Sequence, residues 1–96
     1  MADIELNVTN SYREDDINPV ELSDGTVVKM NYVVDGEKKS MSGVAEKNEE
    51  QIAMLRMNPE GNRIFMQIDP LKDVPADTVV EILETFVAGI KLVLNL

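Results

Sequence analysis

The chain contains no cysteine, no histidine and no tryptophan, and aromatic residues make up only 4% of its 96 residues. Without cysteine it has no disulfide, thiolate nucleophile or iron–sulfur ligand, and without histidine it lacks the commonest general base and metal ligand. No phosphate-binding loop, glycine-rich dinucleotide motif or Gly-x-Ser-x-Gly elbow occurs either. The sequence therefore predicts a protein that is not an enzyme and that holds neither a cofactor nor a metal.

Basic residues are also few. Nine Lys and Arg stand against 18 Asp and Glu, which gives a net charge of −9 at neutral pH. This balance opposes binding to nucleic-acid phosphates, because such binding depends on Lys and Arg. No apolar run approaches the roughly 18 residues of a transmembrane helix, and the first six residues show neither a basic nor an apolar segment. We expect a cytoplasmic protein that contacts neither nucleic acid nor membrane.

The composition that is present is typical of one small folded domain spanning residues 1–96. Apolar residues make up 44% and charged residues 28%, both near the values of ordinary globular proteins. A chain of this length buries a limited share of its surface, and its shortage of aromatics restricts the core further. We therefore expect part of the stability to come from a partner, most simply a second copy in a homodimer.

The acidic residues concentrate near the N-terminus. Residues 10–25 combine low hydrophobicity with turn formers, which predicts an acidic loop. One interpretation is a solvated connection that serves solubility, and the other is an electrostatic contact with a basic protein partner. A calcium loop is disfavoured because the alternating ligand pattern is not met. The residues predicted for the acidic contact are Glu14, Asp15, Asp16, Glu21 and Asp24.

A hairpin is predicted in the first half of the chain. The dipeptide Asp35-Gly36 suits a tight turn, and the strand-like segments Thr26–Val34 and Glu37–Ala45 flank it. A two-residue loop would place Val34 opposite Glu37. Gly43 marks either a notch in the inner face or a bulge where another backbone comes close. The face predicted to point into the core carries Val28, Met30, Tyr32, Val34 and Met41.

A second hairpin is predicted around Asn58–Asn62, which has Pro and Gly at the positions of a type I turn followed by a bulge. Residues 46–57 have high helix propensity, so helix and strand both stay open for them. The turn favours a strand that pairs with residues 63–68, with Met54 opposite Met66. That register places Leu55, Met57 and Phe65 together on one face, and the other face is also apolar: Ile52, Met54, Ile64, Met66 and Ile68.

A sheet that is apolar on both sides needs a cover on both sides. One interpretation is that the chain wraps both faces itself, and the other is a dimer interface. One short chain has few elements with which to cover two faces, so the dimer is favoured. The predicted interface anchors are Leu55, Met57 and Phe65.

Two further elements flank the hairpins. Alternation of Ile4, Leu6 and Val8 predicts an N-terminal strand, and an amphipathic helix is predicted from about Pro75. The helix is expected to end near Gly89, after which residues 90–96 alternate like a strand, although a helix that continues through Gly89 stays open. The apolar stripe of the helix comprises Val79, Ile82, Leu83, Phe86, Val87 and Ile90.

The predicted fold class is α+β: a small antiparallel sheet built from two hairpins and an N-terminal strand, with one C-terminal helix packed on it. The first functional hypothesis is a non-enzymatic protein-interaction module that forms a homodimer through apolar sheet surface. A second is an acidic inhibitor that imitates nucleic-acid charge in a basic protein groove. A third is a protein that holds a small apolar ligand between sheet and helix near Gly43.

Overall fold

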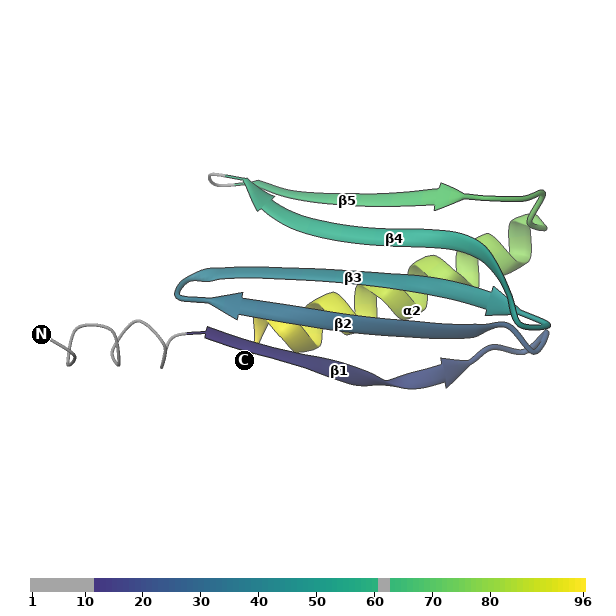
Figure 1. Cartoon of the computed structure of the whole chain (residues 1–96). Helices are drawn as coiled ribbons and strands as arrows, with labels where there is room; N and C mark the ends of the chain where they lie inside the picture. Colours follow the sequence, from purple (N-terminus) through teal and green to yellow (C-terminus); the bar gives the residue numbers. More distant parts are fainter. Residues whose placement is uncertain (1–11, 61–62) are drawn as a thin grey trace, which may run out of the picture.

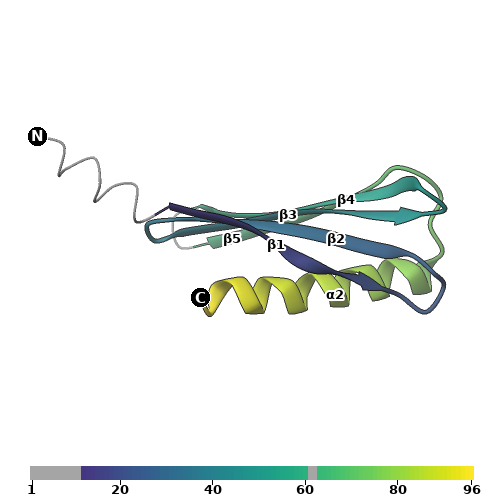
Figure 2. The ribbon, with the colours of Figure 1, turned by 60° about the horizontal axis from the view of Figure 1, so that its bottom comes forward.

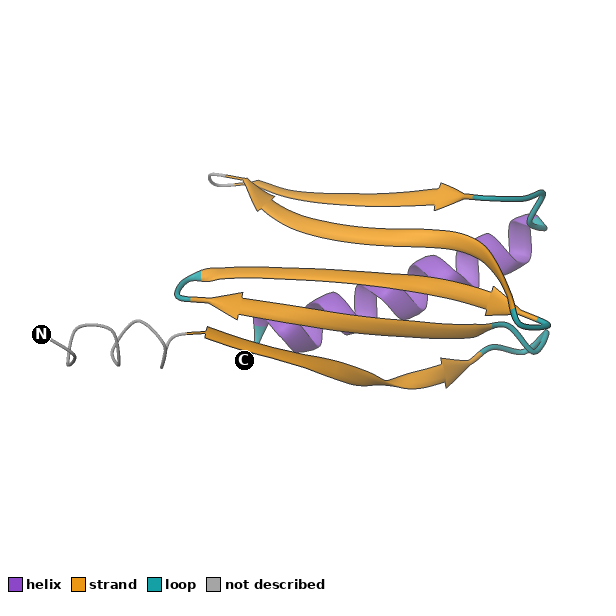
Figure 3. Cartoon of the chain, in the orientation of Figure 1, coloured by secondary structure: helices purple, strands orange, loops and turns teal. Residues whose placement is uncertain are grey.

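The computed structural model describes residues 12–60 and 63–96. They form five antiparallel strands whose order in the sheet is their order in the chain, followed by one helix (Figures 1 and 3). The elements are β1 Tyr12–Glu21, β2 Val27–Asp35, β3 Lys38–Lys47, β4 Glu50–Glu60, β5 Arg63–Pro70 and α2 Ala76–Leu94. The predicted α+β class is confirmed. The predicted strand at Ile4, Leu6 and Val8 lies outside the described residues.

The helix covers one face of the sheet and leaves the other open (Figure 2). It lies mainly against β2 and β3, and the core forms between these elements. Of the five residues predicted to point into the core, Val28, Met30, Tyr32 and Met41 are buried, and Val34 is half-buried and packs against the core. The rest of the core is Ala45, Ala53, Leu55, Met57, Ile82, Phe86, Ile90 and Val93.

The first predicted hairpin is confirmed, but its register differs by two residues. Asp35 pairs with Lys38, and Val34 lies opposite Lys39 rather than Glu37. The turn residues are Gly36 and Glu37, and Gly36 has a φ of 64°. A type II′ turn needs positive φ only at its first central residue, so Gly36 takes that place and Asp35 joins the strand. A shift of two residues keeps every side chain on its predicted face.

The second hairpin is also confirmed, and residues 50–60 are a strand rather than a helix. Its register differs from the prediction by three residues: Met57 lies opposite Met66, and Asn58 lies opposite Phe65. The last pair is Glu60 with Arg63, which leaves two residues between the strands instead of the predicted three. Because an odd shift exchanges the two faces of a strand, Phe65 no longer shares a face with Leu55 and Met57.

The predicted acidic loop is wrong for residues 12–21, which form edge strand β1. Backbone pairing with β2 does not require apolar side chains, and charged side chains are a common feature of edge strands. The irregular part of the segment is confined to a bulge between Ile17 and Val20, which accommodates Pro19. Only the turn between Leu22 and Thr26 is a loop.

The predicted end of the helix at Gly89 is also wrong, because residues 90–94 continue the helix. Gly89 faces the sheet, and a Cβ there would lie 3.0 Å from Met30 Sδ. The helix cost of glycine, about 1 kcal/mol, is offset by this close packing and by burial of Ile90 and Val93 beyond it. Lys39 Nζ donates to the carbonyl oxygens of Leu94 and Leu96, at 3.0 and 3.1 Å, which satisfies groups at the helix end.

Candidate functional site

The two edges of the sheet differ in chemistry. β1 carries one base and four acids, is interrupted by a bulge and contains Pro19, which has no N–H to donate. These are features by which natural proteins prevent another strand from pairing. β5 has the sequence RIFMQIDP, with one base, Arg63, and one acid, Asp69, so its net charge is zero. Of the two edges, β5 has fewer of these features: its pairing with β4 has no bulge, and the proline it contains, Pro70, is its last residue.

The backbone of β5 presents every second residue outward. Leu71 N donates to Ile52 O at 2.9 Å, so the odd-numbered positions on this side of the hairpin bond to β4. Pro70, which has no N–H, occupies the position between two such residues. In an antiparallel ladder the alternate residues point their N–H and C=O away from the partner strand. These residues are Ile64, Met66 and Ile68, and no other described strand pairs with them.

Apolar side chains surround this edge on the helix side. Ile64 and Met66 are 45% and 59% exposed. The helix that covers this face has exposed apolar residues of its own, among them Leu83 and Val87. α2 contacts chiefly β2 and β3, so it leaves the β5 end of this face uncovered (Figure 1). The edge therefore combines free backbone groups with exposed apolar side chains, which is the chemistry of a strand-addition site.

The structure separates the three predicted interface anchors. Leu55 and Met57 are buried in the chain's own core, 3% and 0% exposed, so neither is available as a surface anchor. Phe65 is 49% exposed but lies on the face away from the helix. The predicted register placed Ile64 and Met66 on the apolar face opposite that of the three anchors, and neither residue was predicted as an interface anchor. In RIFMQI, apolar residues occupy both odd and even positions, so both faces of the strand are apolar. This was the feature of the sequence that could have indicated an exposed edge.

The five predicted acidic contact residues are also not brought together. Glu14 and Asp16 lie on the open face, whereas Asp15 lies on the helix side opposite Tyr32. Glu21 is the last residue of β1. Asp24 lies in the β1–β2 turn, where its carboxylate accepts a hydrogen bond from Thr78. The structure thus offers no single acidic surface that unites all five.

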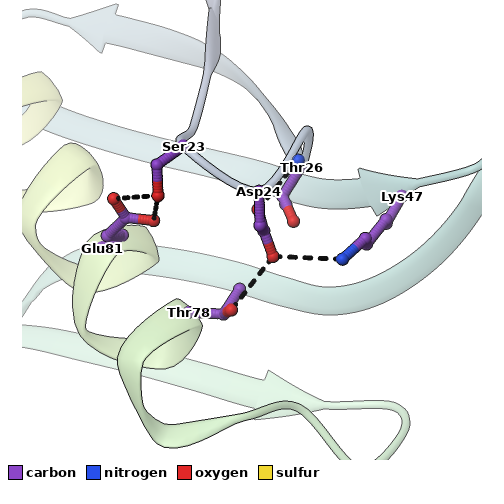
Figure 4. A network of polar contacts seen from close by, with 6 residues as sticks. All are labelled: Ser23, Asp24, Thr26, Lys47, Thr78 and Glu81. Carbon is purple, nitrogen blue, oxygen red and sulfur yellow. Dashed lines mark hydrogen bonds and ion pairs between the residues drawn. The ribbon is translucent and has the colours of Figure 1, made fainter.

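Asp24 links the β1–β2 turn, the end of β3 and the start of α2 (Figure 4). Its carboxylate accepts from the Thr26 N–H at 3.0 Å, from the buried Thr78 hydroxyl at 3.0 Å and from Lys47 Nζ at 3.3 Å. Ser23 next to it donates to Glu81 at 2.8 Å. This network fixes the N-terminal half of the helix on the sheet.

The pKa of the Asp24 carboxyl is held well below its ordinary value. The Thr26 hydroxyl and backbone N–H contribute most, and Thr78 and Lys47 add to the effect. The Thr26 hydroxyl is buried beside the carboxylate at a geometry short of a hydrogen bond, so its contribution is that of a nearby dipole. Each of these groups favours the charged form of the carboxyl.

Replacing Asp24 with asparagine is expected to lower the free energy of unfolding at neutral pH. A carboxyl whose pKa is depressed in the folded state stabilises that state above its unfolded pKa, about 3.9, and the contribution is lost as pH falls. The deficit of Asp24→Asn relative to wild type should therefore shrink between pH 7 and pH 3 in urea titrations. The exposed Asp73→Asn controls for the loss of one charge. An equal deficit at both pH values would contradict this role.

Two hollows are present in the described part of the chain. One, of about 550 Å³, lies on the open face and is lined by both polar and apolar groups, among them Asp16, Lys29, Arg56 and Met54. The other, of about 360 Å³, lies between β1 and α2. Next to Gly43 on the helix side, Met30 Cγ occupies the space, 3.0 Å from the position of a Cβ. At Gly43 itself the space on the helix side is thus taken by Met30, and the hollow between sheet and helix lies at β1.

Neither of two common functional features is found within residues 12–60 and 63–96. No group of three or more carboxylate side chains is arranged to hold a metal ion there. The helix in this part of the chain is not long and apolar enough to cross a membrane. Comparison of the chain with protein-family models, curated protein sequences and solved structures finds no match.

Proposed function

We propose that the protein is a protein-interaction module that forms a homodimer through strand β5. The observation that carries the proposal is the asymmetry of the sheet edges. β1 is blocked by charge, a bulge and Pro19, whereas β5 presents the free backbone groups of Ile64, Met66 and Ile68 among exposed apolar side chains. A long apolar edge of this kind would aggregate unless a partner strand pairs with it.

Charge supports a contact at β5 rather than elsewhere. The chain carries a net charge of −9, so two copies repel each other over most of their surfaces. β5 has one base and one acid and no excess charge, so self-association there meets little electrostatic opposition. The exposed apolar residues Leu83 and Val87 of α2 add apolar surface on the same face of the protein.

Sedimentation equilibrium tests this proposal on the wild type and on Met66→Lys. We expect a dimer at tens of micromolar for wild type and at least about tenfold weaker association for Met66→Lys, because an edge lysine opposes strand pairing. Met66 is 59% exposed, so the monomer should tolerate the substitution. The matched control is Tyr12→Lys on β1, a site 52% exposed with the same change of charge.

The two variants give opposite expectations. Tyr12→Lys should associate as wild type does, because β1 is not the contact strand. A wild type that stays monomeric at tens of micromolar, or a Tyr12→Lys variant that loses association as Met66→Lys does, would overturn the proposal.

A further inference from the structure

The exposed segment of β5 is self-complementary about Met66. Ile64 and Ile68 lie two residues to either side of it, and Arg63 and Asp69 lie three residues to either side. When two such strands pair antiparallel with Met66 opposite Met66, each isoleucine meets an isoleucine. Each arginine then meets an aspartate of the second copy. A strand with this symmetry suits a two-fold contact in which the same patch serves both subunits.

The geometry of the edge restricts the registers that are possible. Ile64, Met66 and Ile68 carry the outward backbone groups, so an even-numbered residue must lie opposite an even-numbered residue. An odd shift would also bring opposite faces of the two strands together. The registers that remain differ from one another in steps of two residues along one strand.

The neighbouring allowed registers are poorer. Placing Phe65 opposite Phe65 sets Arg63 against Gln67 of the second copy and leaves Asp69 beyond the end of the second copy's β5. Placing Gln67 opposite Gln67 sets Asp69 against Phe65. The register centred on Met66 is the one that forms two opposite-charge pairs, and on the helix side it sets Ile64, Met66 and Ile68 opposite one another.

We infer that two copies of the chain join β5 to β5 with Met66 at the two-fold axis, and this inference rests on the proposed homodimer. The result is one continuous antiparallel sheet with both helices on the same face. Ile64 pairs with Ile68 of the second copy, and Arg63 pairs with its Asp69. Three hydrogen-bonded pairs contribute about six backbone hydrogen bonds, within the roughly ten, give or take five, of typical interfaces.

Charge reversal tests which residues lie opposite each other. Arg63→Glu and Asp69→Arg are each expected to weaken self-association about tenfold or more, because each places like charges together at two positions of the dimer. An equimolar mixture of the two variants should form a heterodimer with affinity close to that of wild type. Every charge then again faces its opposite. A mixture that associates no better than the separate variants would overturn the register.

Thiol cross-linking tests the same register without relying on charge, because the wild type has no cysteine. Phe65 and Gln67 of the second copy form a non-hydrogen-bonded pair in this register, with Cα atoms about 4.5 Å apart, which a disulfide can span. A mixture of Phe65→Cys and Gln67→Cys should give a mixed covalent dimer under mild oxidation. Phe65→Cys alone should give little.

The outcomes separate the register from the proposed function. Efficient cross-linking of Phe65→Cys with itself, and no mixed disulfide with Gln67→Cys, would overturn the register while leaving a β5 homodimer in place. Loss of the wild-type dimer itself in sedimentation would overturn both. A mixed disulfide together with recovery in the charge-reversed mixture supports the register centred on Met66.

Discussion

Replacing Phe86 with alanine is expected to reduce the free energy of unfolding by about 3–5 kcal/mol. Phe86 lies at the centre of the α2 face that packs on the sheet and is 1% exposed. Its removal takes away the largest fully buried side chain of a core with few aromatics and leaves a cavity between helix and strands. A domain of this kind has a total stability of about 5–15 kcal/mol, so the loss is a large fraction of it.

Urea titration at one fixed protein concentration measures this effect. With a slope of about 1–3 kcal/mol per molar urea, the midpoint should fall by at least about 1 M. The control is Val80→Ala on the same helix, which is 51% exposed and should change stability by less than about 0.5 kcal/mol. Equal losses for the two variants would contradict the assigned packing face of α2.

Replacing Met30 with alanine is expected to cost about 2–5 kcal/mol. Met30 is 5% exposed and lies between two glycines, Gly43 of β3 and Gly89 of α2. A Cβ on Gly43 would lie 3.0 Å from Met30 Cγ, and a Cβ on Gly89 would lie 3.0 Å from Met30 Sδ. Because neither glycine has a side chain that can move into the space, truncation of Met30 leaves the cavity largely unfilled.

Two other variants make this test specific. Met30→Leu conserves volume and should cost less than about 1.5 kcal/mol. Met54→Ala removes a methionine that is 47% exposed on the open face and should change stability by less than about 0.5 kcal/mol. Thermal or urea unfolding of all three variants gives the comparison. Similar losses for Met30→Ala and Met54→Ala would refute the role of Met30 as the filler between helix and sheet.

The sequence allowed the elements of both hairpins and of the helix to be predicted, because turn residues and apolar periodicity are local properties. The registers in which the strands pair could not be predicted correctly from the sequence. Asp35-Gly36 fits two positions of a tight turn, and the choice between them moves the pairing by two residues without changing the faces. In the second hairpin the difference was odd, and it moved Phe65 to the face opposite Leu55 and Met57.

Other differences come from tertiary contacts that local propensity does not record. Despite its acidic sequence, β1 forms a strand because its backbone pairs with that of β2. α2 continues through Gly89, where the glycine packs closely against the side-chain ends of Met30 and Met41. The candidate site depends on the same register: once Leu55 and Met57 are in the core, the exposed apolar residues are those of β5.

Amide hydrogen exchange along β5 is the most direct test of strand pairing between two copies. The N–H groups of Phe65 and Gln67 bond to β4 and should be protected at every protein concentration. Those of Ile64, Met66 and Ile68 point outward, so we expect them to be protected in the dimer and to exchange rapidly once dilution dissociates it. Rapid exchange of these three amides at all concentrations would contradict pairing at β5.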